Sequence, residues 1–314
     1  MPCKVVRIFL ENRRTQAVLM TQTFDRVYVI VNPVAGSRRP VLARLPRLFE
    51  ERGVQCAVSL TQRSGDGERL AQVAVAGGAD LVVVLGGDGT IAEVASGLAS
   101  TGVPLGIVPG GTANILAVEL GIPTHWGKAF DLIFESEHRL RSLDMGRIGK
   151  RSFLIRASAG YEAAIIAKTR QPFKNRLGPW GYGIGAVRAL NARLRARFRL
   201  RLDGKVCEIS GFNVFIANAG SIGRLGLVLS SRIRPDDGLL DVILLDFAPP
   251  SMLRMLASAI RFDTWARALQ HWQVREVTIE ADSPQAVHAD GEAIGRTPLT
   301  ATVLPGAVEV IVPT

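Results

Sequence analysis

The stretch from Leu81 to Leu98, LVVVLGGDGTIAEVASGL, is the part of the sequence that decides the fold class. It begins with five apolar residues that predict a buried strand, continues with two glycines, and ends with apolar residues at helical spacing from Ile91. Thr90 and Glu93 have the spacing of a capping box, so we expect the helix to open at this threonine. Glycines let backbone N–H groups approach an anion closely, and a helix N-terminus favours negative charge. The stretch therefore predicts a phosphate-binding loop.

The same unit of strand, glycine-bearing loop and helix occurs four times in the first part of the chain. Strands that alternate with helices at this spacing predict a parallel sheet with helices on both faces. The loops that leave the carboxyl ends of such strands gather at one edge, where ligands bind. We therefore expect an α/β domain over residues 23–144. Its strands are expected at residues 27–31, 55–60, 81–85 and 103–108, and its helices at 41–52, 68–76, 91–99 and 115–120.

The pattern changes after about residue 143 to short β-rich runs. Several runs are joined by Asp-Gly pairs, which favour tight hairpins. We expect a second, mostly antiparallel domain over residues 145–299, interrupted by helical stretches at about 182–196 and 251–269. Residues 1–22 are expected to form an N-terminal extension. The β-rich runs lie at residues 153–157, 198–202, 212–217, 239–245, 274–279, 286–289 and 308–312.

Composition limits the class of protein. At 314 residues and 33.8 kDa the chain exceeds the usual size of a single hydrophobic core, which favours two domains. The net charge of +10 indicates anionic partners, and nucleotides, acidic phospholipids and nucleic acid all fit it. Three scattered cysteines predict no disulfide framework and a reducing, cytosolic compartment. We expect no signal peptide. We also expect no transmembrane helix, because the longest uncharged run contains several glycines and two prolines.

Two loops have the composition of a nucleotide site. In the first, Asp88 would repel a phosphate, and a Mg²⁺ ion between them removes that conflict. In the second, PGGTAN at residues 109–114, two glycines allow close backbone approach, Thr112 offers a hydroxyl and Asn114 an amide. The sequence contains neither a Walker A motif nor the protein-kinase signatures. An ordinary strand-to-helix turn is the alternative interpretation of the first loop.

Three motifs in this order and spacing, NPVAGS (32–37), GGDGT (86–90) and PGGTAN (109–114), resemble the diacylglycerol kinase and sphingosine kinase superfamily, especially its bacterial lipid-kinase branch. The resemblance continues through residues 143–146, 235–241 and 290–292, although GGDGT by itself is shared with NAD kinases and similar in phosphofructokinases. It implies an α/β domain like those of NAD kinases and phosphofructokinases, paired with a β-sandwich. The nucleotide would lie in the cleft between the two domains, and residues 300–314 could rejoin the first domain.

The resemblance also implies a set of site residues. The catalytic proton acceptor would lie on the Asp290-Gly291-Glu292 turn, either Asp290 or Glu292, with Asp88 also at the reaction centre. From the residues alone, Asp290 could equally belong to an ordinary hairpin. Mg²⁺ would be bound by the Asp237 side chain and by oxygens of Arg234 and Leu239, and Asp144 would organise the ion's water network with Asp88. ATP would contact Asn32, Pro33, Gly36, Thr61, Gly86, Gly87, Asp88, Gly89, Thr90, Gly110, Gly111, Thr112 and Asn114.

Other candidates have simpler interpretations. Asp203-Gly204 matches no site of the family and predicts a turn. None of the four histidines is expected to be catalytic, and each is expected to have either a satisfied structural role or a solvent-facing one. The residue after Asn114 is Ile115, where many relatives have aspartate. This difference could alter the nucleotide side or the acceptor side of the loop. Arginines at 193, 195, 197, 199 and 201 alternate with mostly apolar residues and predict a strand with a basic face.

The basic face suggests two hypotheses. It could be the solvated side of a half-buried strand. It could instead touch an anionic membrane together with Lys174, Arg176, Trp180 and residues 252–269, which would bring the enzyme to its lipid. The expected partner is a lipid at a membrane surface, with cytoplasmic location, peripheral membrane contact and no nucleic acid, and a homodimer is left open.

The function expected is an ATP- and Mg²⁺-dependent lipid kinase that phosphorylates a diacylglycerol-like, sphingoid or glycerophospholipid hydroxyl. A kinase of a soluble substrate resembling NAD kinases is the first alternative, but it would have an Asn-Glu pair that this sequence lacks. A non-enzymatic lipid or nucleotide sensor is the second. The set of Asp88, Asp144, Asp237, Asp290 and Glu292 argues against it, because a binding protein needs no proton acceptor.

Overall fold

The computed structural model describes residues 24–35, 47, 49–50, 54–134, 138–160, 195–221, 229–230, 232–245 and 270–314. Several sequence-based expectations lie outside the described residues. They are the extension 1–22, Gly36, most of the helix at 41–52, the helical stretches at 182–194 and 251–269, and Lys174, Arg176, Trp180 and Arg193. Residue 196, the expected end of one helical stretch, is the first residue of a strand.

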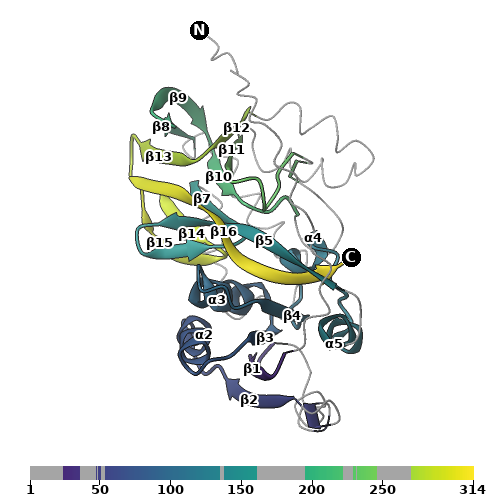
Figure 1. The fold of residues 1–314 in the computed structure, drawn as a ribbon. Coiled ribbons are helices and arrows are strands. Elements are labelled where there is room, and N and C mark those ends of the chain that lie inside the picture. Colours follow the sequence, from purple (N-terminus) through teal and green to yellow (C-terminus); the bar gives the residue numbers. More distant parts are fainter. Residues whose placement is uncertain are drawn as a thin grey trace.

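The first half of the chain forms a parallel sheet with helices, as predicted. Its strand order is β2-β1-β3-β4, and every pairing among these strands is parallel. β3 is buried along its whole length because each residue from Leu81 to Leu85 is apolar and central. The strands are β1 (Arg26–Val31), β2 (Gln55–Leu60), β3 (Leu81–Gly86) and β4 (Leu105–Pro109), and the helices are α2 (Asp66–Ala76), α3 (Asp88–Leu98), α4 (Ile115–Glu119) and α5 (Trp126–Phe134) (Figure 1).

The second half forms the β-sandwich that the sequence analysis predicts. One layer is a six-stranded antiparallel sheet with the order β12-β11-β10-β7-β14-β15. Its inner face packs on β8 (Ala196–Leu202) and β13 (Glu276–Ala281), which belong to the other layer. The six strands are β7 (Arg156–Gly160), β10 (Asn213–Ala217), β11 (Leu240–Leu245), β12 (Gln270–Val274), β14 (Ala286–Ala289) and β15 (Glu292–Arg296).

A single long strand, β16 (Leu299–Pro313), joins the two halves. It pairs with β13 near its start and runs parallel to β4 near its end, so one ten-stranded sheet extends through the molecule (Figure 1). Leu299 lies in the sandwich core, whereas Val310 lies in the core of the α/β domain. β5 (His138–Ile148) pairs along most of this strand, and their register shifts between Leu304 and Val308. The remaining strands are β6 (Arg151–Phe153) and β9 (Lys205–Gly211).

The predicted capping box is wrong. α3 begins at Asp88 rather than Ile91, its N-cap is Gly87, and no side chain caps it. Thr90 Oγ1 instead accepts a hydrogen bond from the Asn32 side chain at 2.9 Å, and Glu93 Oε2 accepts one from the backbone N–H of Gly67 at 2.9 Å. Both side chains therefore serve contacts between loops, which a local pattern cannot reveal.

Two predicted strands, 153–157 and 274–279, are each broken by a bend, for the same reason. The Asp290 carboxylate binds backbone N–H groups between β6 and β7, and Asp203 binds those of Arg275 and Glu276 between β12 and β13. Both aspartates have a positive φ, 46° at Asp203 and 45° at Asp290, and each is followed by a glycine with positive φ. These are the Asp-Gly hairpins expected from the sequence, and Asp203-Gly204 joins β8 to β9.

Gly146 of β5 provides a test of the packing in the sandwich. A Cβ atom at this position would lie 1.9 Å from the ring of Phe153, which is fully buried. We expect Gly146→Ala to lower the free energy of unfolding by about 1–3 kcal/mol, because the ring must move within a packed core. Thermal unfolding would measure the loss. Combining it with Phe153→Leu should destabilise by less than the sum of the two single changes, and full additivity would contradict this contact.

Candidate active site

The two glycine loops lie against each other, backbone to backbone. The N–H of Gly110 donates to the carbonyl of Gly86 at 2.7 Å. A Cβ atom on Gly111 would come within 2.7 Å of the Gly87 Cα atom, so no larger residue fits there. Gly89 differs, because a Cβ atom on it would meet nothing within 4 Å. Most of these glycines therefore allow the loops to meet, and Gly89 presents an open backbone.

The loop after β1 is attached to the same place. The Asn32 side chain donates to Thr90 Oγ1 at 2.9 Å, and its backbone N–H donates to the carbonyl of Leu85 at 2.9 Å. Asn114 closes the second glycine loop by accepting the N–H of Gly111 at 2.8 Å. Thr61 is buried and follows β2, the neighbour of β1. The structure thus brings the loops after β1, β3 and β4 together, while Gly36 lies outside the described residues.

Asp88 connects the glycine loops as well. Its Oδ1 atom accepts the N–H of Leu116 at 3.4 Å, in the first turn of α4. Burial raises the pKa of Asp88, and hydrogen bonds from the backbone around Leu116, Ile115 and Asn114 oppose that rise. The carboxylate therefore has a structural partner at α4 beside the role that the sequence analysis assigns to it.

The turn between β14 and β15 carries Asp290 and Glu292, the pair in which the sequence analysis expects the proton acceptor. Both oxygens of Asp290 accept backbone N–H groups, at 2.7 Å from Leu154, 2.9 Å from Ile155 and 3.0 Å from Arg156. Burial raises the pKa of Asp290, and these three donors oppose the rise. Asp290 thus holds the turn in place, while Glu292 on the same turn contacts the loop after β2 in the α/β domain.

The loop after β2 contacts Glu292 directly. Ser64 Oγ lies 2.5 Å from Glu292 Oε1, and Arg151 of β6 binds the other oxygen at 2.9 Å. The acceptor-side turn and a loop of the α/β domain therefore meet in one place. The sequence analysis placed none of Ser64, Arg151 and Glu93 here: no local motif marks the first two, and the capping-box pattern assigned Glu93 to the start of a helix.

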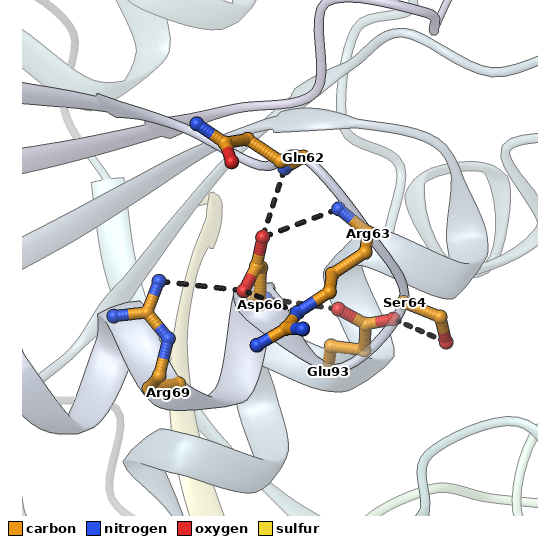
Figure 2. Close-up of polar contacts among 7 residues, drawn as sticks. Gln62, Arg63, Ser64, Asp66, Arg69 and Glu93 are labelled. Atoms are coloured by element: carbon orange, nitrogen blue, oxygen red, sulfur yellow. Dashed lines mark hydrogen bonds and ion pairs between the residues drawn. The ribbon is translucent and has the colours of Figure 1, made fainter.

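Asp66 holds this loop in shape (Figure 2). Its Oδ2 atom accepts the backbone N–H groups of Gln62 at 2.9 Å and Arg63 at 3.2 Å, and its Oδ1 atom pairs with Arg69 at 3.3 Å. The hydrogen bond from Gln62 is the main reason that the pKa of Asp66 is lowered. Because Asp66 begins α2, it fixes the loop that contains Thr61 and Ser64 to a helix.

The acidic turn at residues 235–241 was predicted as a metal site. Asp144 accepts the N–H of Gly238 at 2.6 Å and that of Gly306 at 2.8 Å, so it ties this turn to β16. Asp237 lies nearby, and burial, followed by the charges of Asp241, Asp144 and Asp236, raises its pKa to about 6.

The chemistry of this turn fits a hard cation. The Asp241 carboxylate is buried, and its Oδ2 atom has no hydrogen-bond partner, so a cation would compensate it. Arg234 directs its side chain to Asp236 at 3.3 Å, which leaves its carbonyl oxygen as the expected ligand. Within the described ranges no cluster of three or more His, Cys, Asp or Glu side chains could hold a metal, so backbone oxygens would have to complete this set.

His271 has the structural one of the two roles expected of the histidines. Its side chain is 7% exposed, and its Nε2 atom lies 2.5 Å from Asp241 Oδ1. β12 pairs with β11 and brings the two side chains onto the same face. Burial raises the pKa of Asp241, and the imidazole opposes the rise. The pair adjoins the acidic turn.

The alternating basic strand is confirmed as β8. Its arginines at 197, 199 and 201 are exposed, while Phe198 and Leu200 are buried. Arg199 pairs with Glu280 at 3.8 Å and lies opposite Glu208 of β9, so neighbouring strands compensate part of the charge. In the part of the chain that the structure describes, no helix is long and apolar enough to cross a membrane.

Comparisons with known proteins agree with this architecture. The family model described as "Diacylglycerol kinase catalytic domain" matches residues 26–148, and the one described as "YegS C-terminal NAD kinase beta sandwich-like domain" matches residues 156–312. A Pseudomonas aeruginosa protein named "Probable lipid kinase YegS-like" is 30% identical over 92% of this chain and 95% of its own length.

Two further comparisons extend this result. The crystal structure of a diacylglycerol kinase from Bacillus anthracis is 26% identical, has a TM-score of 0.74, and covers 93% of this chain and 98% of its own. A Synechocystis protein named "Uncharacterized protein sll0036" is 28% identical over 75% of this chain. The chain spans about half the length of that relative, 55%. Sequence and fold therefore agree on one family.

The close approach of the two glycine loops gives a testable prediction. We expect Gly111→Ala to lower the free energy of unfolding by about 1–3 kcal/mol, because the new Cβ atom would push against the backbone of Gly87. Gly89→Ala is the matched control. It lies in the first turn of α3 with open space around it, so its stability should be unchanged or raised by up to about 1 kcal/mol. Equal melting temperatures for the two variants would contradict the loop contact.

Proposed function

Since the chain belongs to the diacylglycerol kinase family of lipid kinases, we propose that it transfers the γ-phosphoryl group of ATP to the hydroxyl group of a lipid. The observation that carries this proposal is the contact between the loop after β2 and the turn that carries Glu292. On the nucleotide side are the glycine loops and the loop after β2, and on the acceptor side is the turn with Glu292. Phosphoryl transfer requires mainly that these two sides hold their substrates in line.

The nucleotide side offers backbone donors for phosphate. Gly89 has an open backbone in the first turn of α3, where N–H groups have no partner within the helix. Asn32 and Thr90 already bind each other at the edge of this turn, which fixes the loop before ATP arrives. We propose that the phosphates lie over this helix start. The other proposed ATP contacts are Pro33, Gly36, Thr61, Gly86, Gly87, Asp88, Gly110, Gly111, Thr112 and Asn114.

The acceptor side supplies the proton acceptor. The lipid hydroxyl oxygen forms a bond to the γ-phosphorus, the bond from that phosphorus to the β–γ bridging oxygen breaks, and ADP leaves. We propose that Glu292 takes the hydroxyl proton. Asp290 is the less suited of the pair, because its oxygens bind three backbone N–H groups of a bend, whereas those of Glu292 bind the side chains of Ser64 and Arg151. Its role is then to hold the turn that carries Glu292.

The acidic turn would hold Mg²⁺. The proposed ligands are the Asp237 carboxylate and the carbonyl oxygens of Arg234 and Leu239, while Asp144 holds the turn through Gly238. Oxygen ligands of this kind suit a hard cation. When bound, Mg²⁺ would neutralise negative charge in the cleft. Asp88 accepts the N–H of Leu116 in α4, and its proposed part is on the nucleotide side.

The acceptor is proposed at the level of a class. A diacylglycerol-like lipid is the first candidate, since similar proteins are named diacylglycerol kinases, and sphingoid and glycerophospholipid hydroxyls are the others. We propose residues 23–144, rejoined by 300–314, as the nucleotide domain, residues 145–299 as the lipid domain and residues 1–22 as an extension. Peripheral contact with a membrane from the cytoplasm and a homodimer stay proposals. Because Glu280 compensates part of the charge of Arg199, the basic face is a weaker candidate for contact with an anionic membrane.

Transfer of label from γ-labelled ATP tests the function. With Mg²⁺ and mixed micelles containing diacylglycerol, a sphingoid base, ceramide or a glycerophospholipid, beside NAD, we expect label in one lipid class. Glu292→Gln should lower kcat by about 10²–10⁴-fold, because the proton acceptor is lost. Labelling of NAD and of no lipid would contradict the proposal.

Paired aspartate variants separate the roles on the turn. Asp290→Asn should lower both stability and kcat, because an amide replaces a carboxylate that accepts three N–H groups. Asp203→Asn is the matched control, since it makes the same change in the other Asp-Gly hairpin. It should lower stability and leave kcat unchanged. If Glu292→Gln keeps wild-type kcat while Asp290→Asn remains folded and inactive, Asp290 is the proton acceptor.

Thermal unfolding with and without Mg²⁺ tests the metal site. We expect Mg²⁺ to raise the melting temperature of the wild type above its value in EDTA, because a ligand of the folded state stabilises it. Asp237→Asn should abolish this rise. In EDTA at neutral pH it should not be less stable than the wild type, because a raised pKa means that folding disfavours the charged carboxylate. Asp282→Asn, an exposed control, should keep the full response. An unchanged response in Asp237→Asn would refute this site.

A further inference from the structure

Ser64 lies between two carboxylates that come from different parts of the molecule. Its Oγ atom is 2.5 Å from Glu292 Oε1 in the sandwich and 3.3 Å from Glu93 Oε1 in α3 (Figure 2 shows the contact with Glu93). The outer oxygens of both carboxylates have their own donors, the Arg151 side chain for Glu292 and the N–H of Gly67 for Glu93. The serine hydroxyl therefore joins the α/β domain to the acceptor-side turn.

The hydroxyl can donate to only one carboxylate at a time, because it carries a single proton. The shorter distance favours Glu292 as the acceptor of that proton. Donation to a charged oxygen makes the contact stronger than a neutral hydrogen bond. Glu93 then remains a second possible acceptor for the same hydroxyl, at 3.3 Å.

We propose that Ser64 is a positioning residue for phosphoryl transfer, whose hydroxyl keeps the Glu292 carboxylate charged and aimed into the cleft. The inference rests on the proposed function, in which Glu292 accepts the proton of the lipid hydroxyl. It goes beyond that function by linking the nucleotide side to the proton acceptor through one named hydrogen bond.

The loop that carries Ser64 is held in shape by side-chain contacts. Asp66 binds the N–H groups of Gln62 and Arg63 and begins α2, and Glu93 binds Gly67, so the loop is fixed at both of its ends (Figure 2). Thr61, a proposed ATP contact, is three residues before Ser64 in the same loop. Occupancy of the nucleotide side and the placement of Glu292 therefore depend on one short, rigid segment.

The charges around Glu292 determine what loss of the hydroxyl would do. Arg151 from β6 and the Ser64 hydroxyl favour its charged form, while Glu93 from α3 and Asp290 in its own hairpin disfavour it. Without the hydroxyl, the two carboxylates would lose the donor that Ser64 places between them. The pKa of Glu292 should then rise, and the acid limb of the kcat profile should move to higher pH, since a proton acceptor must be deprotonated.

The pH dependence of kcat in three variants tests this inference. Ser64→Ala should lower kcat about tenfold near neutral pH, change the KM for ATP by less than about twofold, and move the acid limb up by roughly one pH unit. Ser64→Thr keeps the hydroxyl and should restore most of both. Ser96→Ala is the matched control, because that hydroxyl donates to the carbonyl of Ala92 within α3, and it should behave as wild type.

Two results would overturn the inference. One is an active wild type whose Ser64→Ala variant has the same kcat and acid limb, and the other is a Ser64→Thr variant as impaired as Ser64→Ala. Thermal unfolding of Ser64→Ala, Glu292→Ala and the double variant gives a readout without catalysis, and zero coupling would refute the contact. A wild-type protein that phosphorylates no lipid would instead contradict the proposed function.

Discussion

The buried carboxylate of Asp144 is the interaction on which the joining of the two halves depends. It accepts the N–H of Gly238 in the acidic turn and the N–H of Gly306 in β16. Gly306 has a φ of 56° and lies where the register of β16 shifts, at the passage from the sandwich core to the α/β core. A buried carboxylate needs strong donors, so the two amides and the carboxylate require each other. The two cores are therefore joined by a shared strand, β16.

The same chemistry recurs wherever the chain must bend. Asp66, Asp203 and Asp290 each bind two or more successive or neighbouring backbone N–H groups, and Asp80 does so at the start of β1. A carboxylate has room for several donors, and a bend between strands leaves several N–H groups without a ladder partner. An aspartate in a family motif can therefore be required for shape. For Asp290 this distinction matters, since its three donors give it a structural task at the place where the chemistry is proposed.

Glycine has a comparable double use in the site. Gly86, Gly87, Gly110 and Gly111 allow two loops to touch through their backbones, so these residues are needed before any ligand binds. Gly89 of the first loop differs from them, because a Cβ atom added there would meet nothing within 4 Å. Rigid loops of this kind reduce the entropy that binding must overcome. The arrangement also places Ser64, on a third loop, against the acceptor-side turn.

The sequence by itself determined the architecture: the parallel α/β half, a mostly antiparallel second half and most strand positions follow from periodicity, glycine loops and Asp-Gly turns. The family and the sandwich form of the second half follow from the resemblance of three motifs to known lipid kinases. The assignments of individual site residues stay predictions. Only the tertiary structure decided that Thr90 and Glu93 leave the helix cap for other loops, that the strands predicted at 153–157 and 274–279 break, and that His271 is buried against Asp241. It also placed Ser64 beside Glu292, although the two residues lie 228 positions apart in the chain. The physical reason is the distance along the chain over which each kind of interaction acts. Local patterns encode backbone periodicity and turn preference, whereas a hydrogen bond between distant loops depends on how two sheets and their connections pack.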